Sequence, residues 1–197
     1  MSTKFRIDKM IKSKNRRIKA ANLQMHNRRA LSSTEKNMEI HQNNMFKDRV
    51  KRIAIGADHG AFDAKEALKK YLEALGYKVF DVGTTNSSTK VDYPDFALAV
   101  SKKVVSGACD RGIMLDAAGI GSSMACNKVK GVRAALCWSP ETIVNSRAHN
   151  NANVLTMGTL QHSISDMASM VKLWLETRFE GGKHWPRINK MMSIERM

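Results

Sequence analysis

The stretch from Met114 to Ala125 places a carboxylate, Asp116, at the end of an apolar run and directly before a turn with two glycines, Gly119 and Gly121. Backbone N–H groups at such a turn, and at the helix start that follows it, are exposed donors that suit a phosphate or a developing oxyanion. The stretch lacks both the six-residue dinucleotide fingerprint and the Lys-Ser/Thr ending of a nucleotide P-loop. The chemistry indicated is anion binding beside an acid.

Other short segments carry side chains suited to binding or changing a small charged molecule, and they contain Asp58, His59, Tyr93, His149, Asn150, Lys183 and Arg187. Each has a structural interpretation as well. Asp58 could cap the helix that follows it, and Asp116 could accept N–H bonds at its own turn as an inert anion. His149, near a helix end, could be a solvated side chain.

The elements that must position these residues begin at Lys51-Arg52, where a polar, basic segment gives way to the apolar run 53–57. From there, short β-type runs alternate with helix-length segments. This alternation indicates βαβ units and a parallel sheet covered by helices on both faces. For residues 52–197 we predict an α/β fold: a three-layer αβα sandwich around a mostly parallel, Rossmann-like sheet of about five strands.

In open sheets of this kind, ligands bind beyond the carboxyl ends of the strands. The residues that directly follow the strands are therefore the ones to examine. We expect three segments at that edge: Asp58-His59, Asp116 to Gly121, and the segment near His149-Asn150.

Residues 1–51 form a predicted basic extension. Residues 1–52 hold 15 Lys and Arg against 4 Asp and Glu, which is most of the net charge of +15. Apolar residues from Ile7 to Met25 recur at helical spacing, opposite basic ones, and predict an amphipathic helix. It could pack on its own domain or on a dimer partner, or it could be a frayed tail. The alternatives are an organelle-targeting peptide and a helix that docks on an enclosing assembly or an anionic surface. Nucleic-acid binding would rest on charge alone.

The composition excludes several other classes of protein. No apolar run approaches the roughly 20 residues that span a bilayer, and the N-terminal residues lack the apolar centre of a secretory signal. Cys109, Cys126 and Cys137 form no CxxC pair, so neither a disulfide framework nor a zinc site is indicated. We therefore expect a cytoplasmic protein with reduced cysteines, organelle targeting through the extension being the alternative.

Six motifs in the same order together resemble one family. They are GADHGAFDAKEAL, VDYPDFA, LDAAGIGSSMACNK, NKVKGVRAAL, RAHNNANVLTMG and FEGGKHWPR. Residues 52–190 resemble ribose-5-phosphate isomerase B and the galactose-6-phosphate isomerase subunits. The resemblance implies an aldose–ketose isomerase that needs no metal or other cofactor. It also implies a phosphorylated sugar as substrate, and a homodimer or a dimer of dimers whose active sites are shared between subunits.

In the family, a residue at the end of the third motif's strand removes the proton from C2 and gives an enediolate. That residue is commonly the cysteine of a Cys-Gly-Thr-Gly pattern, whereas residues 116–119 read Asp-Ala-Ala-Gly. A carboxylate can act as the base where burial or nearby acids raise its pKa. We therefore assign the base to Asp116, and the oxyanion site to the amides of Gly119, Ile120 and Gly121.

The resemblance also assigns ring opening and substrate binding. His149 matches the histidine that opens the furanose ring, and Ala118 replaces a threonine that assists it. Lys183 and Arg187 match two basic phosphate ligands, while a third position, arginine in relatives, is Leu160 here. The resemblance makes the remaining matched residues part of the substrate site: Asp58, His59, Tyr93 and Asn150.

The predicted reaction is the interconversion of ribose 5-phosphate and ribulose 5-phosphate. The replacements at positions 116, 118 and 160 leave two alternatives. One is isomerisation of another sugar phosphate, such as galactose 6-phosphate. The other is a non-catalytic family member used in assembly or sensing, and the matched residues that remain at the pocket argue against it.

Overall fold

The computed structural model describes residues 50–196. The predicted amphipathic helix lies outside these residues, and of the predicted extension only Val50 and Lys51 lie within them. The first strand begins at Arg52. The boundary between extension and domain stays a prediction.

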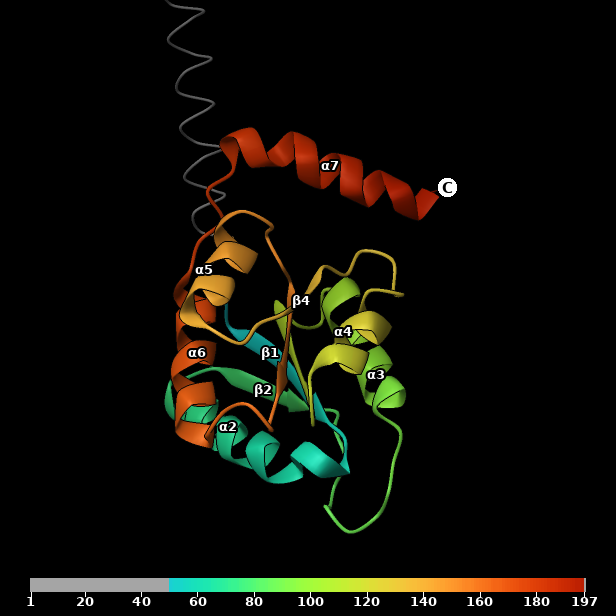
Figure 1. The fold of residues 1–197 in the computed structure, drawn as a ribbon, viewed down its shortest axis with the longest axis vertical. Coiled ribbons are helices and arrows are strands. Elements are labelled where there is room, and N and C mark those ends of the chain that lie inside the picture. Colours follow the sequence, from blue (N-terminus) through green and yellow to red (C-terminus); the bar gives the residue numbers. More distant parts are fainter. Residues whose placement is uncertain (1–49, 197) are drawn as a thin grey trace, which may run out of the picture. The chain divides into compact units, whose positions relative to one another are not determined.

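Five parallel strands form one sheet in the order β2-β1-β3-β5-β4 (Figure 1). Their bounds are β1 (Arg52–Ala57), β2 (Lys78–Asp81), β3 (Arg111–Asp116), β4 (Ala134–Leu136) and β5 (Val154–Gly158). Because the central strand β3 lies between β1 and β5, residues that end β1, β3 and β5 meet at one edge of the sheet. The predicted parallel sheet is confirmed.

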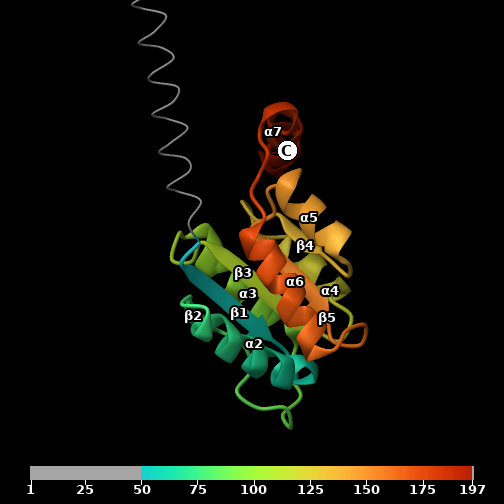
Figure 2. The same ribbon diagram turned by 90° about the vertical axis from the view of Figure 1, so that its left-hand side faces the viewer.

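Helices cover both faces of this sheet (Figures 1 and 2). One face carries α2 (Phe62–Ala74), α5 (Pro140–Ala148) and α6 (Ile164–Glu176), and the other carries α3 (Tyr93–Val105) and α4 (Ile120–Cys126). Beyond the amino ends of the strands lies α7 (Trp185–Ser193). Three 3-10 turns complete the described chain: η1 (His59–Ala61), η2 (Gly182–His184) and η3 (Ile194–Arg196). The predicted three-layer sandwich is confirmed. No helix in residues 50–196 is both long and apolar enough to cross a membrane.

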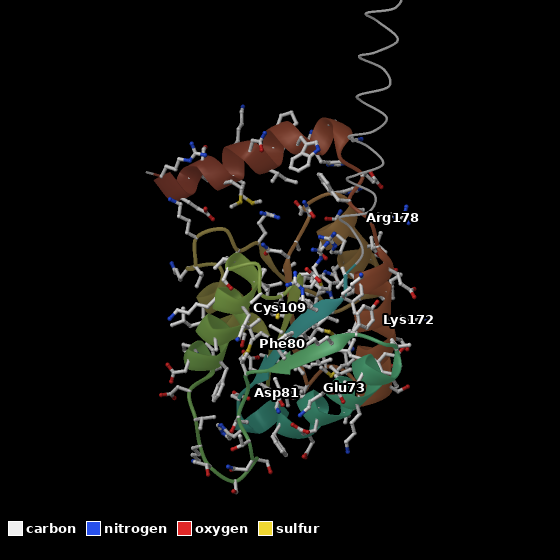
Figure 3. All side chains as sticks on the ribbon, turned by 180° about the vertical axis from the view of Figure 1, so that it is seen from behind. Glu73, Phe80, Asp81, Cys109, Lys172 and Arg178 are labelled. Atoms are coloured by element: carbon white, nitrogen blue, oxygen red, sulfur yellow. The ribbon has the colours of Figure 1, made fainter. Side chains whose placement is uncertain are left out.

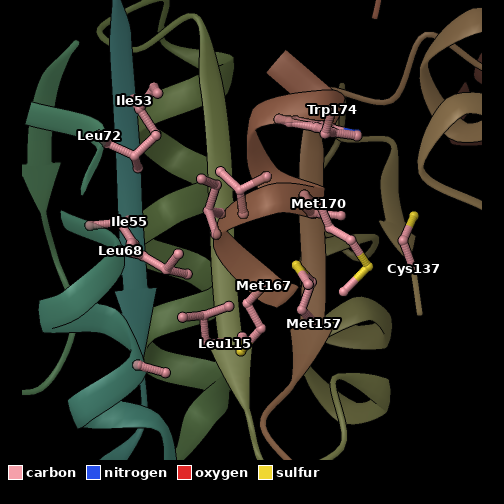
Figure 4. Packing of buried hydrophobic residues seen from close by; sticks show 14 of the residues in the cluster. Ile53, Ile55, Leu68, Leu72, Leu115, Cys137, Met157, Met167, Met170 and Trp174 are labelled. Atoms are coloured by element: carbon pink, nitrogen blue, oxygen red, sulfur yellow. The ribbon is translucent and has the colours of Figure 1, made fainter. Parts of the chain in front are cut away.

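The larger part of the core lies between the sheet and the helices α2 and α6 (Figure 4). Side chains alternate along a strand, so Ile53 and Ile55 of β1 face these helices while Ala54 faces the other side. They pack, together with Leu115 of β3, among buried side chains of the two helices: Leu68, Leu72, Met167, Met170 and Trp174.

On the other face, α3 packs closely against the sheet. A Cβ added at Gly56 or at Gly112 would lie 2.7 Å from a side-chain carbon of Val100. Only glycine at these two strand positions therefore lets α3 approach as it does. Phe80 and Cys109 belong to the same cluster on this side of the sheet (Figure 3).

A buried lysine ties the end of β2 to α2. The ammonium of Lys65, whose side chain is 1% exposed, donates to Asp81 at 2.5 Å. Asp81 also accepts from Lys69 at 3.1 Å and from the N–H of Gly83 at 3.0 Å. Burial alone would raise the pKa of Asp81, but the hydrogen bonds from Lys65, Gly83 and Lys69 outweigh it and lower this pKa. The network fixes the strand end from which the chain enters the loop before α3.

Candidate functional site

Two carboxylates meet at the carboxyl edge of the sheet. Asp58 follows β1 and Asp116 ends the neighbouring strand β3. The N–H of Asp58 donates to the carbonyl of Leu115 at 3.4 Å. The backbone of Asp58 therefore lies beside the residue that precedes Asp116, and the sequence-based placement of both acids at one edge is correct.

Asp58 caps the 3-10 turn η1. Its Oδ1 accepts hydrogen bonds from the N–H groups of Gly60, at 3.0 Å, and Ala61, at 3.2 Å. Within residues 50–196, no group donates to Oδ2. The capping role that the sequence suggested is present, and it occupies one of the two carboxylate oxygens.

His59 and Tyr93 stand beside this acid because of the loop that precedes α3. Nδ1 of His59 accepts from the N–H of Val91 at 3.3 Å, which ties the loop to η1. Tyr93 begins α3 and packs on the glycine turn: a Cβ added at Gly121 would lie 2.5 Å from Cζ of the tyrosine ring. The fold therefore gathers His59, Tyr93 and the turn around the two acids.

Asp116 is 5% exposed, and its carboxylate is surrounded by donors of its own turn. Oδ1 accepts from the N–H of Ala118, at 2.9 Å, and from the N–H of Gly119. Oδ2 accepts from the N–H of Ser122, at 3.0 Å, and from the Ser122 hydroxyl, at 2.5 Å. These are the contacts of a structural anion. They favour that interpretation, which the sequence left open, over the assignment of the base to Asp116.

The same contacts take donors that the sequence analysis assigned to the substrate. Of the three amides assigned to the oxyanion, that of Gly119 points to Asp116, while those of Ile120 and Gly121 are not among its partners. Gly119 has a φ of 77°, in the left-handed region that favours glycine. A Cβ there would also lie 2.9 Å from the nitrogen of Gly158. The turn is therefore held closely against the end of β5.

The pKa of Asp58 is raised from its ordinary value. Burial is the largest cause, and the charge of Asp116 is the second. The nearby His59 and the hydrogen bonds from Ala61 and Gly60 act in the opposite direction without cancelling the shift. Asp58 is thus an acid with a raised pKa and with one oxygen that accepts from no donor in residues 50–196, beside a second carboxylate whose two oxygens are both occupied.

The other predicted residues lie elsewhere. His149, Asn150 and Arg187 line one pocket of about 330 Å³ together with Asn145, His184, Ile188 and Met191. The expectation that His149-Asn150 lie at the carboxyl edge is wrong. These residues follow α5, which runs back from the end of β4 towards the amino ends of the strands, and they precede β5.

His149 in this pocket is held by other side chains. Its Nδ1 lies 3.0 Å from Nδ2 of Asn145, and its ring stacks on that of His184 with centroids 4.4 Å apart. The Nε2 atoms of both histidines lie near Oε2 of Glu180, at 3.6 Å for His149 and 3.5 Å for His184. Lys183, which was also assigned to phosphate binding, is exposed in η2 next to this pocket.

The donor atoms of His149, Glu180 and His184 lie within 4.8 Å of one another, which is close enough to consider a metal ion. Two imidazoles that bind one ion both direct a ring nitrogen at it, in the plane of each ring. Here the ring planes are stacked and only 10° apart, so the two planes do not meet near the rings, where an ion would have to lie. The cluster is better described as a stacked pair of histidines near a carboxylate.

The two groups of predicted residues are far apart in one chain. In the pairing of β3 with β5, Gly112 is level with Val154 and Asp116 is level with Gly158. The four-residue offset along the strands corresponds to roughly 13 Å. His149 ends α5, which runs back towards the amino ends of the strands, so it lies on the far side of the sheet from Asp116. One copy of the chain therefore cannot bring both groups to one small substrate.

The two further departures from the family pattern lie at the carboxyl edge. The N–H of Ala118 donates to Asp116, and its methyl side chain offers no hydroxyl. Leu160 follows β5, its N–H donates to the carbonyl of Ala117 at 3.0 Å, and its side chain is 77% exposed. An exposed apolar side chain thus stands where the resemblance leads one to expect a phosphate-binding arginine.

Four residues of these two groups were not singled out from the sequence: Ser122, Asn145, Glu180 and His184. Asn145 precedes His149 by four residues on a helical pattern, and this spacing could have identified it. Ser122 contacts Asp116 only because the glycine turn folds back, and the sequence holds no signal for that. The contacts of Glu180 and His184 with His149 depend on where the loop after α6 runs, which is also a tertiary property.

The chain is similar to known proteins over most of the described residues. A family model described as ribose/galactose isomerase matches residues 53–191. A putative sugar phosphate isomerase of Bacillus subtilis is 40% identical over 144 residues, which are 73% of this chain and 97% of that protein. Ribose-5-phosphate isomerase B of Escherichia coli is 38% identical over 146 residues, covering 74% of this chain and 97% of its own.

The solved structures lead to the same family. Ribose-5-phosphate isomerase B of Mycoplasma genitalium, solved with bound ribulose-5-phosphate, superposes with a TM-score of 0.71 and 38% sequence identity. The match covers 74% of this chain and 96% of that one.

Proposed function

Since the chain belongs to the ribose/galactose isomerase family and is a sugar-phosphate aldose–ketose isomerase, we propose that its substrates are ribose 5-phosphate and ribulose 5-phosphate. Support for the pentose comes from relatives named ribose-5-phosphate isomerase B and from the Mycoplasma genitalium structure with bound ribulose-5-phosphate. The observation in this chain that carries the proposal is the pair of acids with His59 and Tyr93 around a glycine turn, at the edge where open α/β sheets bind ligands.

The reaction needs three tasks, which the two groups divide between them. His149 opens the furanose ring by moving a proton between the ring oxygen and the C1 hydroxyl. Arg187 and Lys183 hold the phosphate, Arg187 with the two-pronged grip that lysine lacks. At the carboxyl edge, a carboxylate takes the C2 proton, and the amides of Ile120 and Gly121 stabilise the enediolate. The sequence-based interpretation gives the base to Asp116.

We propose that the active unit is a dimer in which each site combines the carboxyl edge of one copy with the His149 pocket of the other. A second copy is required because one chain places the two groups at opposite ends of its sheet. A groove of about 1000 Å³ beside the edge strand β4 gives the second copy of the chain a surface on which to dock. Its lining is largely apolar and includes Val132, Ala134, Leu136, Met191, Met192 and Ile194. In an isologous dimer the same contact forms two such sites.

The alternative substrate is a hexose 6-phosphate. It is favoured by the exposed Leu160 and by the methyl group of Ala118, since both alter the carboxyl edge relative to the pentose pattern. A longer sugar would carry its phosphate further from C2, and loss of one phosphate ligand at this edge is compatible with that.

A panel of aldose phosphates tests the proposal. The full chain is incubated with ribose, allose, galactose and glucose phosphates, and ketose formation is followed. The expected result is the highest kcat/KM with ribose 5-phosphate. A higher kcat/KM with a hexose phosphate would move the proposal to that sugar, and no turnover with any member would contradict an active isomerase.

Mixed dimers test the shared site. Asp58→Asn and His149→Asn each remove one of the two groups, so each variant alone should be nearly inactive. Co-expressed, they form mixed dimers in which one site carries both changes and the other carries neither. With random pairing, activity should return to about a quarter of the parent level. If the activity of the mixture stays at the sum of the two single variants, each site belongs to one chain.

A further inference from the structure

The two carboxylates at the catalytic edge differ in their capacity to take up a proton. A carboxylate has about four lone-pair positions. At Asp116, four donors of the turn are directed at them, two on each oxygen, and three of these donors are backbone N–H groups. Asp116 could accept the C2 proton only if one of these hydrogen bonds broke.

Asp58 does not have this restriction. Both of its hydrogen bonds fall on Oδ1, and no described group donates to Oδ2. The cap fixes the orientation of the carboxylate, which leaves the second oxygen oriented and unoccupied. A general base needs this combination of a held side chain and a free lone pair.

The electrostatics of the edge support the same choice. Burial and the charge of Asp116 raise the pKa of Asp58, while His59 lowers it. Among residues 50–196, Asp116 and His59 are the titratable groups whose charges shift this pKa. A base is most effective when its pKa lies near the working pH, so the shift is in the useful direction.

We propose that Asp58, and not Asp116, is the base that takes the proton from C2 of the open-chain aldose. This proposal rests on the isomerase function proposed above. As the C2–H bond breaks, its electron pair forms the C1–C2 double bond and the carbonyl pair moves to O1. The carboxylic acid of Asp58 then returns a proton to C1. The proton of the C2 hydroxyl passes to O1, which leaves the carbonyl at C2. Atoms and charge balance without any further reactant.

In this arrangement Asp116 is a positioning residue. Its carboxylate holds the turn from Ala118 to Ser122 in shape, and its charge raises the proton affinity of Asp58. Replacement of the common cysteine by aspartate thus moves proton transfer to the neighbouring strand end.

Asp58→Asn is the test, because asparagine keeps the Oδ1 acceptor of the cap and removes the basic oxygen. Turnover of ribose 5-phosphate and deuterium uptake from D₂O at C1 of the ketose and C2 of recovered aldose are measured for the full chain. We expect kcat and deuterium uptake to fall about 10²–10⁴-fold, with KM changed less than about tenfold. Asp63→Asn, an exposed acid on α2, is the matched control and should equal the parent.

A residue that only binds a sugar hydroxyl would behave differently. Its loss would raise KM and leave deuterium uptake per turnover intact, and this result at Asp58 would overturn the proposal. Asp58→Glu separates the roles again, because it keeps a carboxylate at this position. If residue 58 is the base, this variant should still exchange deuterium measurably, and the acid limb of its pH profile of kcat/KM should be displaced. If Asp116→Asn abolishes exchange while Asp58→Asn does not, the base is Asp116. An inactive parent chain would instead contradict the isomerase function itself.

Discussion

Asp116→Asn separates an anchoring acid from a catalytic one, because the structure gives the cost of the change. The best orientation of the new amide keeps its oxygen on the N–H groups of Ala118 and Gly119, and turns its NH₂ towards Ser122. The Ser122 hydroxyl can rotate to accept a hydrogen bond. The Ser122 N–H, which now donates at 3.0 Å, would face another donor. The opposite orientation is worse, since it leaves two amides without an acceptor.

The magnitude follows from these contacts. Leaving one buried donor without a partner costs about 1–3 kcal/mol. Each of the two retained bonds changes from a charged to a neutral acceptor and loses about 1 kcal/mol. The sum is about 3–5 kcal/mol of the free energy of unfolding. In a domain of this size each kcal/mol corresponds to roughly 2–4 °C in Tm, so Tm should fall by about 10 °C.

Urea denaturation and thermal unfolding measure this loss, and kcat is measured per folded molecule well below the variant's Tm. Ser122→Ala is the matched control. It removes only the hydroxyl bond to the charged Oδ2, so it should cost about 1.5–3 kcal/mol, less than Asp116→Asn. We expect Asp116→Asn to change kcat per folded molecule less than about tenfold. An unchanged Tm together with a loss of about 10²–10⁴-fold in kcat would refute the anchoring role and restore the sequence-based assignment of the base.

Three other outcomes are expected. Activity should persist after exhaustive chelation, because the enediolate can be held by amides and the stacked rings of His149 and His184 do not converge on an ion; recovery only after a divalent ion is added would show otherwise. Removing residues 1–50 should leave a folded, active protein, since β1 begins at Arg52, and an insoluble or inactive truncation would show that the extension is part of the core or dimer interface. Stability should fall in acid, because folding lowers the pKa of Asp81. The Asp81 carboxylate contributes fully to the free energy of unfolding above its unfolded-state pKa, and this contribution is lost as pH falls through its folded-state pKa. Urea midpoints between about pH 5 and 2 should therefore decline less steeply for Asp81→Asn than for the parent.

The sequence by itself determined the architecture and the residue types of the site. Apolar runs alternating with helical patterns predict a parallel sheet covered on both faces, because burial on both faces is what such strands require. The position of Asp58 and Asp116 at one edge also follows, since both come directly after strands. These are local properties: a strand end can be recognised from the few residues on either side of it.

Tertiary structure decided what each residue contacts. The sequence places His149 only on a segment, and a helix carries it to the opposite end of the sheet from Asp116, which is why the proposed site combines two copies. The sequence shows an acid before two glycines, but whether that acid faces a substrate or its own turn depends on the path of the backbone from Ala118 to Ser122. Hydrogen bonds join groups by distance in space and not by position along the chain. The occupied oxygens of Asp116 and the free oxygen of Asp58 could therefore be recognised only once the strands were placed side by side.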